Sequence, residues 1–439
     1  MMRQVYSTLC YLCVPIVLGR LLWRSRKNAA YRQRWAERFG FLPKNIPQNC
    51  LWVHSVSVGE TIAAVPLIKG FQKMHPDVPV VVTTMTINGA KQVVTSFGQT
   101  VTHVYVPYDL PDAINRFIDH VKPKMLLIME TELWPNLLHI CAARNVPIFL
   151  ANARLSQRSA ARYAKFFTLV SAMMKNITKV AVQTQVEVDR FIALGLPADR
   201  IQVTGTVKFD VVVADEIMQK GKQFREQIGR DRPVWIAAST HQGEEEIILE
   251  SFKIIKQKYP QLLLILVPRH PERAKDVATL CKNANFQIVL FTEQKAITHE
   301  VDIFLTDTIG QLMTQYVAAD IAFVGGSLIA TGGHNVLEPA VSGIPVITGP
   351  EMFNFVESTQ LLKQAGALWQ INDAAQLADK VNELLQNPAQ REQAGKAGQQ
   401  VIEKNRGAVQ KHLQLIEELF NTTSESINNK FKEGEKVES

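Results

Sequence analysis

Carboxylate side chains follow two apolar runs in the first half of the chain. Glu60 ends the stretch HSVSVGE, and Glu130 and Glu132 end the stretch MLLIMETE. Carboxylates at the end of a buried strand are unusual in a core and common in sites. Because a carboxylate can accept the proton of a hydroxyl group, these residues indicate general base chemistry on an alcohol, such as a sugar hydroxyl.

Glu60 also has a structural interpretation. Ser57 and Glu60 match the capping-box pattern S-x-x-E ahead of an apolar helix. A helix N-terminus favours an ionised carboxylate, so we expect Glu60 to be charged at neutral pH. Local sequence leaves capping and catalysis both open for this residue. For Glu244, which lies in a later EEE run, capping and solvation are sufficient explanations.

The second acidic pair has two interpretations as well. Alternation along a strand turns Glu130 and Glu132 to the same side, so either can be the functional one. A capped helix start before Pro135 explains the same residues without any function.

Cations stand at other predicted strand ends. Lys208 ends VTGTVK, Arg269 and His270 follow LLLILVP, and Arg154 and Arg158 lie in ANARLSQRS. A cation at a strand end is a natural partner for a phosphate or a sugar carboxylate, although a surface ion pair is the default for any one of them.

Three glycine-rich turns follow in the second half: DTIGQL (307–312), VGGSLIATGGHNVLEP (324–339) and SGIPVITGP (342–350). We expect their backbone amides to meet a nucleotide, with Glu338 binding ribose hydroxyls. Ordinary tight turns are the alternative. The sequence contains no G-x-G-x-x-G, no Walker loop and no D-x-D, and its histidines lack ligand spacing, so neither an NAD-dehydrogenase nor a metal-dependent transferase is favoured.

The elements that position these residues occur twice. Residues 51–86 and 234–271 both show a buried strand, a turn, a helix, a proline and a second buried strand. Gly59, Glu60 and Pro76 recur 184 positions later as Gly243, Glu244 and Pro260. A βαβ unit that opens each half predicts two parallel-sheet domains.

Short Val, Ile and Leu runs alternate with helical patterns through both halves, as in strands covered on both faces. The predicted fold class is therefore α/β, with two doubly wound Rossmann-like domains facing a cleft, which is the GT-B glycosyltransferase architecture. The predicted divisions are a membrane anchor at 1–26, an N-terminal acceptor domain at 27–210, a C-terminal nucleotide-sugar domain at 211–405, and a helix with a polar tail at 406–439. Composition predicts that the tail from about residue 421 is disordered.

The net charge of +7 is concentrated at the N-terminus. Residues 1–50 hold nine basic residues and one acid, whereas the remainder has 39 basic and 40 acidic residues. A nucleic-acid surface is disfavoured, and a local contact with anionic lipid is favoured. Five scattered cysteines, including a Cys10–Cys13 pair in an apolar run, fit a reduced cytosolic setting.

The N-terminus is suited to a membrane. Residues 5–19 carry no charge, and Arg24, Arg26 and Lys27 keep the following body in the cytoplasm by the positive-inside rule. The run is borderline in length, so spanning the bilayer and lying on it both stay open. The aromatic residues Tyr31, Trp35 and Phe39, with Arg32, Arg34 and Arg38 around them, form either a core stripe or a helix against anionic headgroups.

Seven ordered motifs resemble those of the Kdo (3-deoxy-D-manno-octulosonic acid) transferases of Gram-negative bacteria: HSVSVGE, METELWPN, NARLSQRS, VTGTVKFD, VPRHPER, DTIGQL and GGHNVLEP. The resemblance covers residues 1 to about 405. It implies an enzyme of the bacterial inner membrane, with its catalytic body on the cytoplasmic side. Such an enzyme moves Kdo from CMP-Kdo to a lipid A precursor (lipid IVA) in lipopolysaccharide synthesis, with inversion and without a metal or cofactor.

The resemblance also implies roles for single residues. Glu60 matches the family's general base, and Glu130 and Lys208 match positions that stabilise the transition state. The matching CMP-binding residues are Pro268, Arg269, Ile309, Gly310, Gln311, Asn335, Val336, Leu337 and Glu338. The nearest alternative is another GT-B nucleotide-sugar enzyme, such as a hydrolysing UDP-sugar 2-epimerase. A non-catalytic scaffold at the membrane surface is a third, and the clustered carboxylates argue against it.

Overall fold

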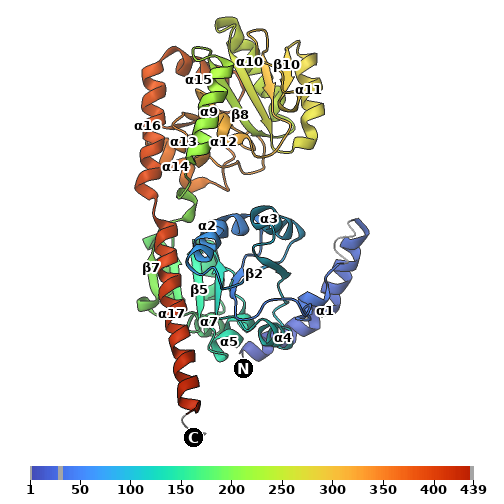
Figure 1. Ribbon diagram of the computed structural model, residues 1–439, viewed down its shortest axis with the longest axis vertical. Helices are drawn as coiled ribbons and strands as arrows, with labels where there is room; N and C mark the ends of the chain where they lie inside the picture. Colours follow the sequence, from blue (N-terminus) through green and yellow to red (C-terminus); the bar gives the residue numbers. More distant parts are fainter. Residues whose placement is uncertain (1, 28–32, 436–439) are drawn as a thin grey trace. The chain divides into compact units, whose positions relative to one another are not determined.

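The computed structural model describes residues 2–27 and 33–435. The chain folds as two units, each with its own parallel sheet (Figure 1). The first comprises the chain up to Val207 together with the segment from Arg406, and the second comprises Lys208–Asn405. The C-terminal segment therefore returns to the first unit, which the sequence analysis does not predict.

The first unit is built on seven parallel strands in the order β3-β2-β1-β4-β5-β6-β7. They are β1 (Leu51–His54), β2 (Val80–Thr84), β3 (Thr102–Tyr105), β4 (Met125–Met129), β5 (Ile148–Ala153), β6 (Lys179–Val182) and β7 (Ile201–Val203). β1, β2, β4 and β5 are buried along their whole length, as continuous aliphatic runs predict.

Helices cover both faces of this sheet. They are α1 (Met2–Lys27), α2 (Val58–Met74), α3 (Ile87–Phe97), α4 (Pro111–Val121), α5 (Pro135–Ala143), α6 (Gln157–Ala164), α7 (Phe167–Met174), α8 (Gln185–Ala193) and α17 (Ala408–Glu435), with short 3-10 turns η2 (Ala36–Phe39) and η3 (Ala198–Arg200). Trp52 and Leu51 turn to opposite faces and enter two separate apolar clusters. The cluster around Leu51 includes Leu413 and Phe420 of α17, so the C-terminal helix completes the first core.

The second unit repeats the plan with strands in the order β10-β11-β9-β8-β12-β13-β14. They are β8 (Val234–Thr240), β9 (Leu263–Pro268), β10 (Ile288–Leu290), β11 (Ile303–Leu305), β12 (Ile321–Val324), β13 (Val346–Thr348) and β14 (Leu368–Gln370). Its helices are α9 (Asp215–Ile228), α10 (Glu244–Lys258), α11 (Ala274–Asn283), α12 (Leu312–Ala318), α13 (Leu337–Val341), α14 (Val356–Gln364), α15 (Ala374–Gln386) and α16 (Pro388–Asn405), with 3-10 turns η4 (Val207–Phe209), η5 (Pro271–Arg273) and η6 (Phe291–Glu293).

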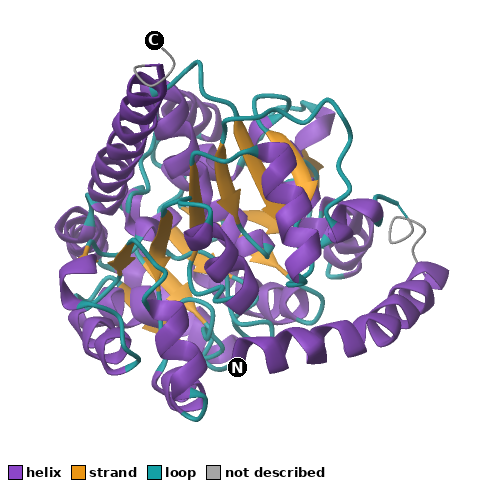
Figure 2. Ribbon diagram, turned by 90° about the horizontal axis from the view of Figure 1, so that it is seen from below, coloured by secondary structure: helices purple, strands orange, loops and turns teal. Residues whose placement is uncertain are grey.

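The predicted internal repeat is confirmed. β1–α2–β2 and β8–α10–β9 are both βαβ units, and the strands of each pair in parallel. In Figure 2 the strands of both sheets lie among flanking helices. This arrangement is the two-domain α/β class expected from the alternating runs, because a parallel sheet must be covered on both faces.

The structure contradicts one alternative for the aromatic stripe, the helix against headgroups, and the prediction of a disordered tail. No continuous helix carries the aromatic stripe, because Arg34 has a left-handed φ of 58° and only Ala36–Phe39 form a 3-10 turn; Tyr31 and Arg32 lie outside the described residues. The guanidinium groups are bound within the first unit: Arg34 pairs with Glu37 at 2.6 Å, and Arg38 stacks on Tyr105 at 4.4 Å. At the other end, α17 continues through Glu435, so the polar tail is helical to that point.

Helix α1 is long and apolar enough to cross a membrane by length and composition, over Met2–Trp23. Its first half is also hydrogen-bonded to the rest of the first unit. The Arg3 guanidinium and the Ser7 hydroxyl both donate to Asn136 Oδ1, at 3.2 and 2.9 Å. Asn136 lies at the start of α5, so α1 runs along the folded body near that helix.

Candidate active site

The predicted carboxylates meet at the point where the strand order of the first sheet reverses. β1 lies between β2 and β4, and His54 of β1 pairs with Ile128 of β4. Glu60 follows β1, and Glu130 and Glu132 follow β4. Parallel strands place their carboxyl ends at one edge, and such a reversal opens a crevice there, which is where α/β proteins bind ligands.

Glu60 is held in the first turn of α2 by two hydrogen bonds to its carboxylate. The Ser57 hydroxyl donates to Oε1 at 2.7 Å, and the backbone N–H of Val56 donates to Oε2 at 2.7 Å. Ser57 is the N-cap, and its hydroxyl accepts from the Glu60 N–H at 3.4 Å. Ser57 is therefore confirmed as the N-cap, whereas the second bond of a capping box is replaced by the bond from the Val56 N–H. Capping does not use all the acceptor capacity of the Glu60 carboxylate, because each oxygen keeps a second lone pair.

The expectation that Glu60 is fully charged at neutral pH is wrong. The residue is only 7% exposed, and burial raises its pKa from 4.5 to about 7, with smaller contributions from the negative charges of Glu132 and Glu130. Loss of hydration outweighs the helix N-terminus and the two hydrogen bonds. A carboxylate with a pKa near 7 is well matched to a general base, since it ionises at working pH and retains basicity.

The loop after β4 carries the second acidic pair in an unusual conformation. Glu130 has a left-handed φ of 57°, so strand alternation ends at Met129 and does not set the direction of the pair as predicted. Glu132 accepts a hydrogen bond from Trp134 Nε1 at 3.0 Å, and burial raises its pKa. Positive φ at a non-glycine residue costs about 1 kcal/mol or more and is concentrated at functional sites.

A buried neutral histidine packs against the loop that carries Glu130 and Glu132. His54 is fully buried at the end of β1, and burial lowers its pKa to about 3. Its Nδ1 lies 3.1 Å from the Thr83 hydroxyl, and its ring meets the Trp134 ring edge-on at 5.1 Å. His54 therefore packs under Trp134, which in turn holds Glu132.

The second sheet has the same reversal, because β8 lies between β9 and β12. The predicted nucleotide residues follow strands of this region. Pro268 ends β9 and Arg269 follows it, residues 309–311 follow β11, and residues 335–338 follow β12. All of them therefore lie at the carboxyl edge of one sheet. Ile309 is 84% exposed there, an unusual position for a large aliphatic side chain.

Asn335 and Glu338 form a small polar cluster with Arg269. Asn335 Nδ2 donates to Glu338 Oε1 at 3.1 Å, while its Oδ1 accepts from the Leu337 N–H at 3.0 Å. Burial raises the pKa of Glu338, and the positive charge of Arg269 partly offsets that rise. The structure thus brings Arg269, Asn335 and Glu338 together; Val336 and Leu337 are buried beneath them.

Glu244 has a role that local sequence does not reveal. It is fully buried and accepts backbone hydrogen bonds from Gly326 at 2.7 Å and from Ser327 and Leu328 at 3.0 Å each, besides His241 at 3.0 Å. These amides belong to the glycine-rich turn that we expected to bind a nucleotide. For residues 326–328 that expectation is wrong, because a carboxylate of the same chain already occupies their amides.

Three histidines lie beside this turn, and their spacing in the sequence does not indicate that they form a group. His241 Nε2 lies 2.8 Å from His334 Nε2, the two rings are stacked, and His270 meets His241 edge-on at 5.8 Å. Burial and nearby Arg269 lower the pKa of His334 to about 4. In the described part of the chain no three His, Cys, Asp or Glu side chains are arranged to hold a metal ion.

The remaining candidates are more dispersed. Lys208 is exposed in η4, and its Nζ lies 5.5 Å from the centre of the Phe355 ring in the second unit. Arg154 and Arg158 are exposed beyond β5 in the first unit. The backbone of Arg154 is tied to the acidic loop, since its carbonyl accepts from the Thr131 hydroxyl.

Two protein families match this chain, one over each half. Residues 33–211 match the family described as 3-Deoxy-D-manno-octulosonic-acid transferase (kdotransferase), and residues 231–401 match Glycosyl transferases group 1. The chain is 43% identical to the 3-deoxy-D-manno-octulosonic acid transferase of Haemophilus influenzae over 95% of this chain and 98% of that protein.

Two solved structures are similar to this chain. The C-terminal CMP-Kdo binding domain of WaaA from Acinetobacter baumannii is 32% identical, covering 43% of this chain and 99% of its own, with a TM-score of 0.42. The UDP-GlcNAc 2-epimerase of Neisseria meningitidis is 14% identical over 85% of this chain and 99% of its own, with a TM-score of 0.54. The epimerase shares the GT-B fold alone, whereas identity along nearly the whole length shows descent: this chain belongs to the 3-deoxy-D-manno-octulosonic acid transferase family.

Proposed function

We propose that this enzyme transfers Kdo from CMP-Kdo to a hydroxyl group of a lipid A precursor, with inversion and without a metal ion. The observation that carries the proposal is the environment of Glu60. A carboxylate whose pKa burial raises to about 7 stands at the reversal point of the first sheet, in a chain of the Kdo transferase family.

Glu60 acts as the general base on the acceptor. Its carboxylate takes the proton of the attacking sugar hydroxyl while the hydroxyl oxygen bonds to the anomeric carbon of Kdo. The bond from that carbon to the phosphate oxygen breaks at the same time, and its electrons leave with CMP. A single displacement of this kind inverts the anomeric centre.

The second unit holds the donor nucleotide. Arg269 supplies positive charge for the phosphate, Glu338 and Asn335 bind the ribose hydroxyls, and exposed Ile309 packs on the base. Gly310 and Gln311 belong to the same turn, in which Gly310 has a φ of 95°. CMP-Kdo carries a single phosphate, so cationic side chains can offset the leaving charge without a metal.

Glu130 and Lys208 stabilise the transition state in this proposal. The anomeric carbon gains positive character as the bond to CMP lengthens, and a nearby carboxylate favours that charge. Lys208 offsets the developing charge on the leaving phosphate. The reaction requires the donor held by the second unit and the hydroxyl at Glu60 to come within bonding distance during turnover.

The acceptor is a lipid, so the enzyme works at a membrane surface. The apolar helix α1 and the basic N-terminal segment support attachment to the anionic inner membrane, with the catalytic body on the cytoplasmic side.

Product analysis tests the proposal. Purified full-length protein is incubated with a tetra-acylated disaccharide acceptor and either CMP-Kdo or UDP-N-acetylglucosamine, and the products are analysed by mass spectrometry. We expect the acceptor to gain the mass of one or more Kdo residues with CMP-Kdo alone, with release of CMP. An unchanged acceptor together with epimerised or hydrolysed UDP-sugar would assign the enzyme to the epimerase class instead.

A further inference from the structure

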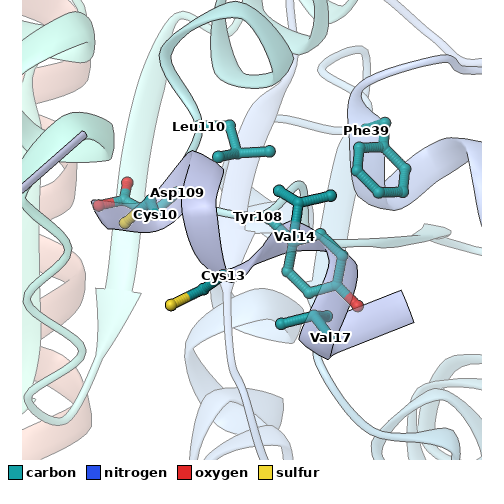
Figure 3. Close-up of a pocket in the computed structure, with 8 residues that line it drawn as sticks. All are labelled: Cys10, Cys13, Val14, Val17, Phe39, Tyr108, Asp109 and Leu110. Atoms are coloured by element: carbon teal, nitrogen blue, oxygen red, sulfur yellow. The ribbon is translucent and has the colours of Figure 1, made fainter. Parts of the chain in front are cut away.

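A cavity of about 160 Å³ lies between α1 and the rest of the first unit (Figure 3). On the α1 side it is lined by Cys10, Cys13, Val14 and Val17, which recur at helical spacing on one face. Tyr108 and Leu110, which follow β3 and precede α4, line the opposite side together with Phe39. Phe39 and Tyr108 meet edge-on at 5.6 Å.

Polar contacts fasten α1 beside this cavity. Arg3 and Ser7 bind Asn136, and the Tyr11 hydroxyl donates to the Asp112 carboxylate of α4. These contacts extend over more than two turns of the first half of the helix. A helix bonded in this way lies along the folded body instead of crossing a bilayer as a separate segment.

The opposite face of α1 is apolar and exposed. Leu9, Leu12 and Ile16 are 55%, 68% and 72% exposed, and Trp23 extends the same face. In water such a surface is unfavourable, whereas against the hydrocarbon edge of a bilayer it is stabilising. If a bilayer covers this face, it lies beside the cavity, on the other side of the same helix.

The cavity itself suits hydrocarbon. Among the residues lining it, Asp109 is the one ionisable carboxyl group, and its two oxygens accept from the Asn136 and Leu137 N–H groups of α5 at 3.1 and 2.8 Å. Its hydrogen-bonding capacity is thus directed into the protein. An apolar cavity of about 150 Å³ holds a molecule of the size of benzene, so this one has room for about six carbons of a chain.

The cavity also lies at the edge that carries Glu60. Tyr108 and Leu110 follow the carboxyl end of β3, which is separated from β1 by β2 alone. Two strand spacings amount to about 10 Å. We propose that the cavity between α1 and the β3–α4 turn binds part of one acyl chain of the lipid acceptor, while the sugar hydroxyl of the same molecule reaches Glu60. This inference rests on the proposed function.

Val14→Trp tests it, because the indole fills the cavity. Ile16→Trp is the matched control, since it adds the same side chain to the exposed face of the same helix. Transfer from CMP-Kdo is measured in detergent with the acylated acceptor and with its fully deacylated disaccharide. We expect Val14→Trp to raise KM for the acylated acceptor by about tenfold or more and to leave the KM for the deacylated acceptor and for CMP-Kdo unchanged. Ile16→Trp should match the wild type on both acceptors.

Equal kinetics of Val14→Trp and wild type on the acylated acceptor would overturn the acyl-chain site while leaving the transferase intact. Absence of transfer by the wild type would instead overturn the proposed function.

A second measurement tests the site even if the Val14→Trp protein folds poorly. Cys10 and Cys13 line the cavity, whereas Cys50, Cys141 and Cys281 are buried elsewhere. Cys13 is exposed, so Cys10 is the informative thiol. The acylated acceptor should slow maleimide labelling of Cys10 in the wild type, and the deacylated acceptor should not; equal labelling of Cys10 with both would refute the site.

Discussion

Transfer by this enzyme should fall steeply as the pH drops below neutrality, because Glu60 must be ionised to accept a proton. Burial and two neighbouring carboxylates raise its pKa from 4.5 to about 7. That rise corresponds to about 3 kcal/mol between the protonated and ionised forms. Below pH 7 we expect kcat/KM to decrease by about tenfold for each pH unit, and above it to level off.

Glu132→Gln shows whether the fall of kcat/KM below pH 7, the acid limb of the pH profile, reports the ionisation of Glu60. Glutamine keeps an oxygen for the Trp134 N–H but removes a negative charge that raises the pKa of Glu60. The acid limb should therefore move to lower pH. Because burial is the largest cause of the rise, we expect a displacement of about 1 pH unit or less. Asp77→Asn removes an exposed charge from the loop before β2, at the opposite edge of the sheet, and should leave the limb in place.

The assay is the initial rate of Kdo transfer at subsaturating acceptor, from about pH 5 to 9, since kcat/KM reports the free enzyme. A limb that Glu132→Gln leaves unmoved would refute the electrostatic coupling. A flat profile through pH 7 would refute the assignment of Glu60 as the base.

Three further predictions concern the donor site, its support and the membrane. Arg269→Ala should weaken CMP binding by about tenfold or more in calorimetry, whereas Arg230→Ala, on an exposed helix-end ion pair, should not; equal affinities would remove Arg269 from the site. Glu244→Gln should lower the free energy of unfolding by about 2–4 kcal/mol in urea titrations and weaken CMP binding, because it weakens the hydrogen bonds that hold the glycine-rich turn. The same substitution at the exposed neighbour, Glu246→Gln, should change neither quantity. Leu12→Glu should reduce co-sedimentation with anionic vesicles severalfold; undiminished binding would show that the exposed face of α1 does not meet lipid.

The sequence predicts the aliphatic strands of both sheets, including the edge strands β3 and β10, and misses β7 and β14. Runs such as MLLIM and LLILVP are long, aliphatic and buried on both faces, so their composition identifies them. β7 and β14 have three residues each and lie at sheet edges. Two positions of β7 are exposed and two of β14 are only half-buried, so neither strand gives a long apolar run. The aromatic stripe before Gly40 fails as a helix because Arg34 takes a left-handed conformation and pairs with Glu37, which periodicity does not register.

Candidate site residues could be predicted where they directly or closely follow a predicted strand. Glu60, Glu130 and Arg269 follow buried runs, and parallel topology then brings each to the edge of its sheet. Glu244 could not be recognised in this way. Its partners lie 82 to 84 residues further along the chain, and only the fold brings their amides to its carboxylate. The raised pKa of Glu60 could not be predicted from the sequence for the same reason, because it depends on burial and on carboxylates that follow another strand.

One measurement tests most directly whether the base belongs to the first unit and the nucleotide to the second. Glu60→Gln is compared with wild type for CMP affinity by calorimetry and for single-turnover transfer from CMP-Kdo at pH 8. Glu187→Gln is the matched control, because Glu187 closes a buried capping box at the start of α8 in the same unit. We predict that Glu60→Gln binds CMP like the wild type and transfers Kdo about 100-fold more slowly or worse, with Glu187→Gln unimpaired. A near-normal single-turnover rate in Glu60→Gln would contradict this account and leave that residue only its helix cap.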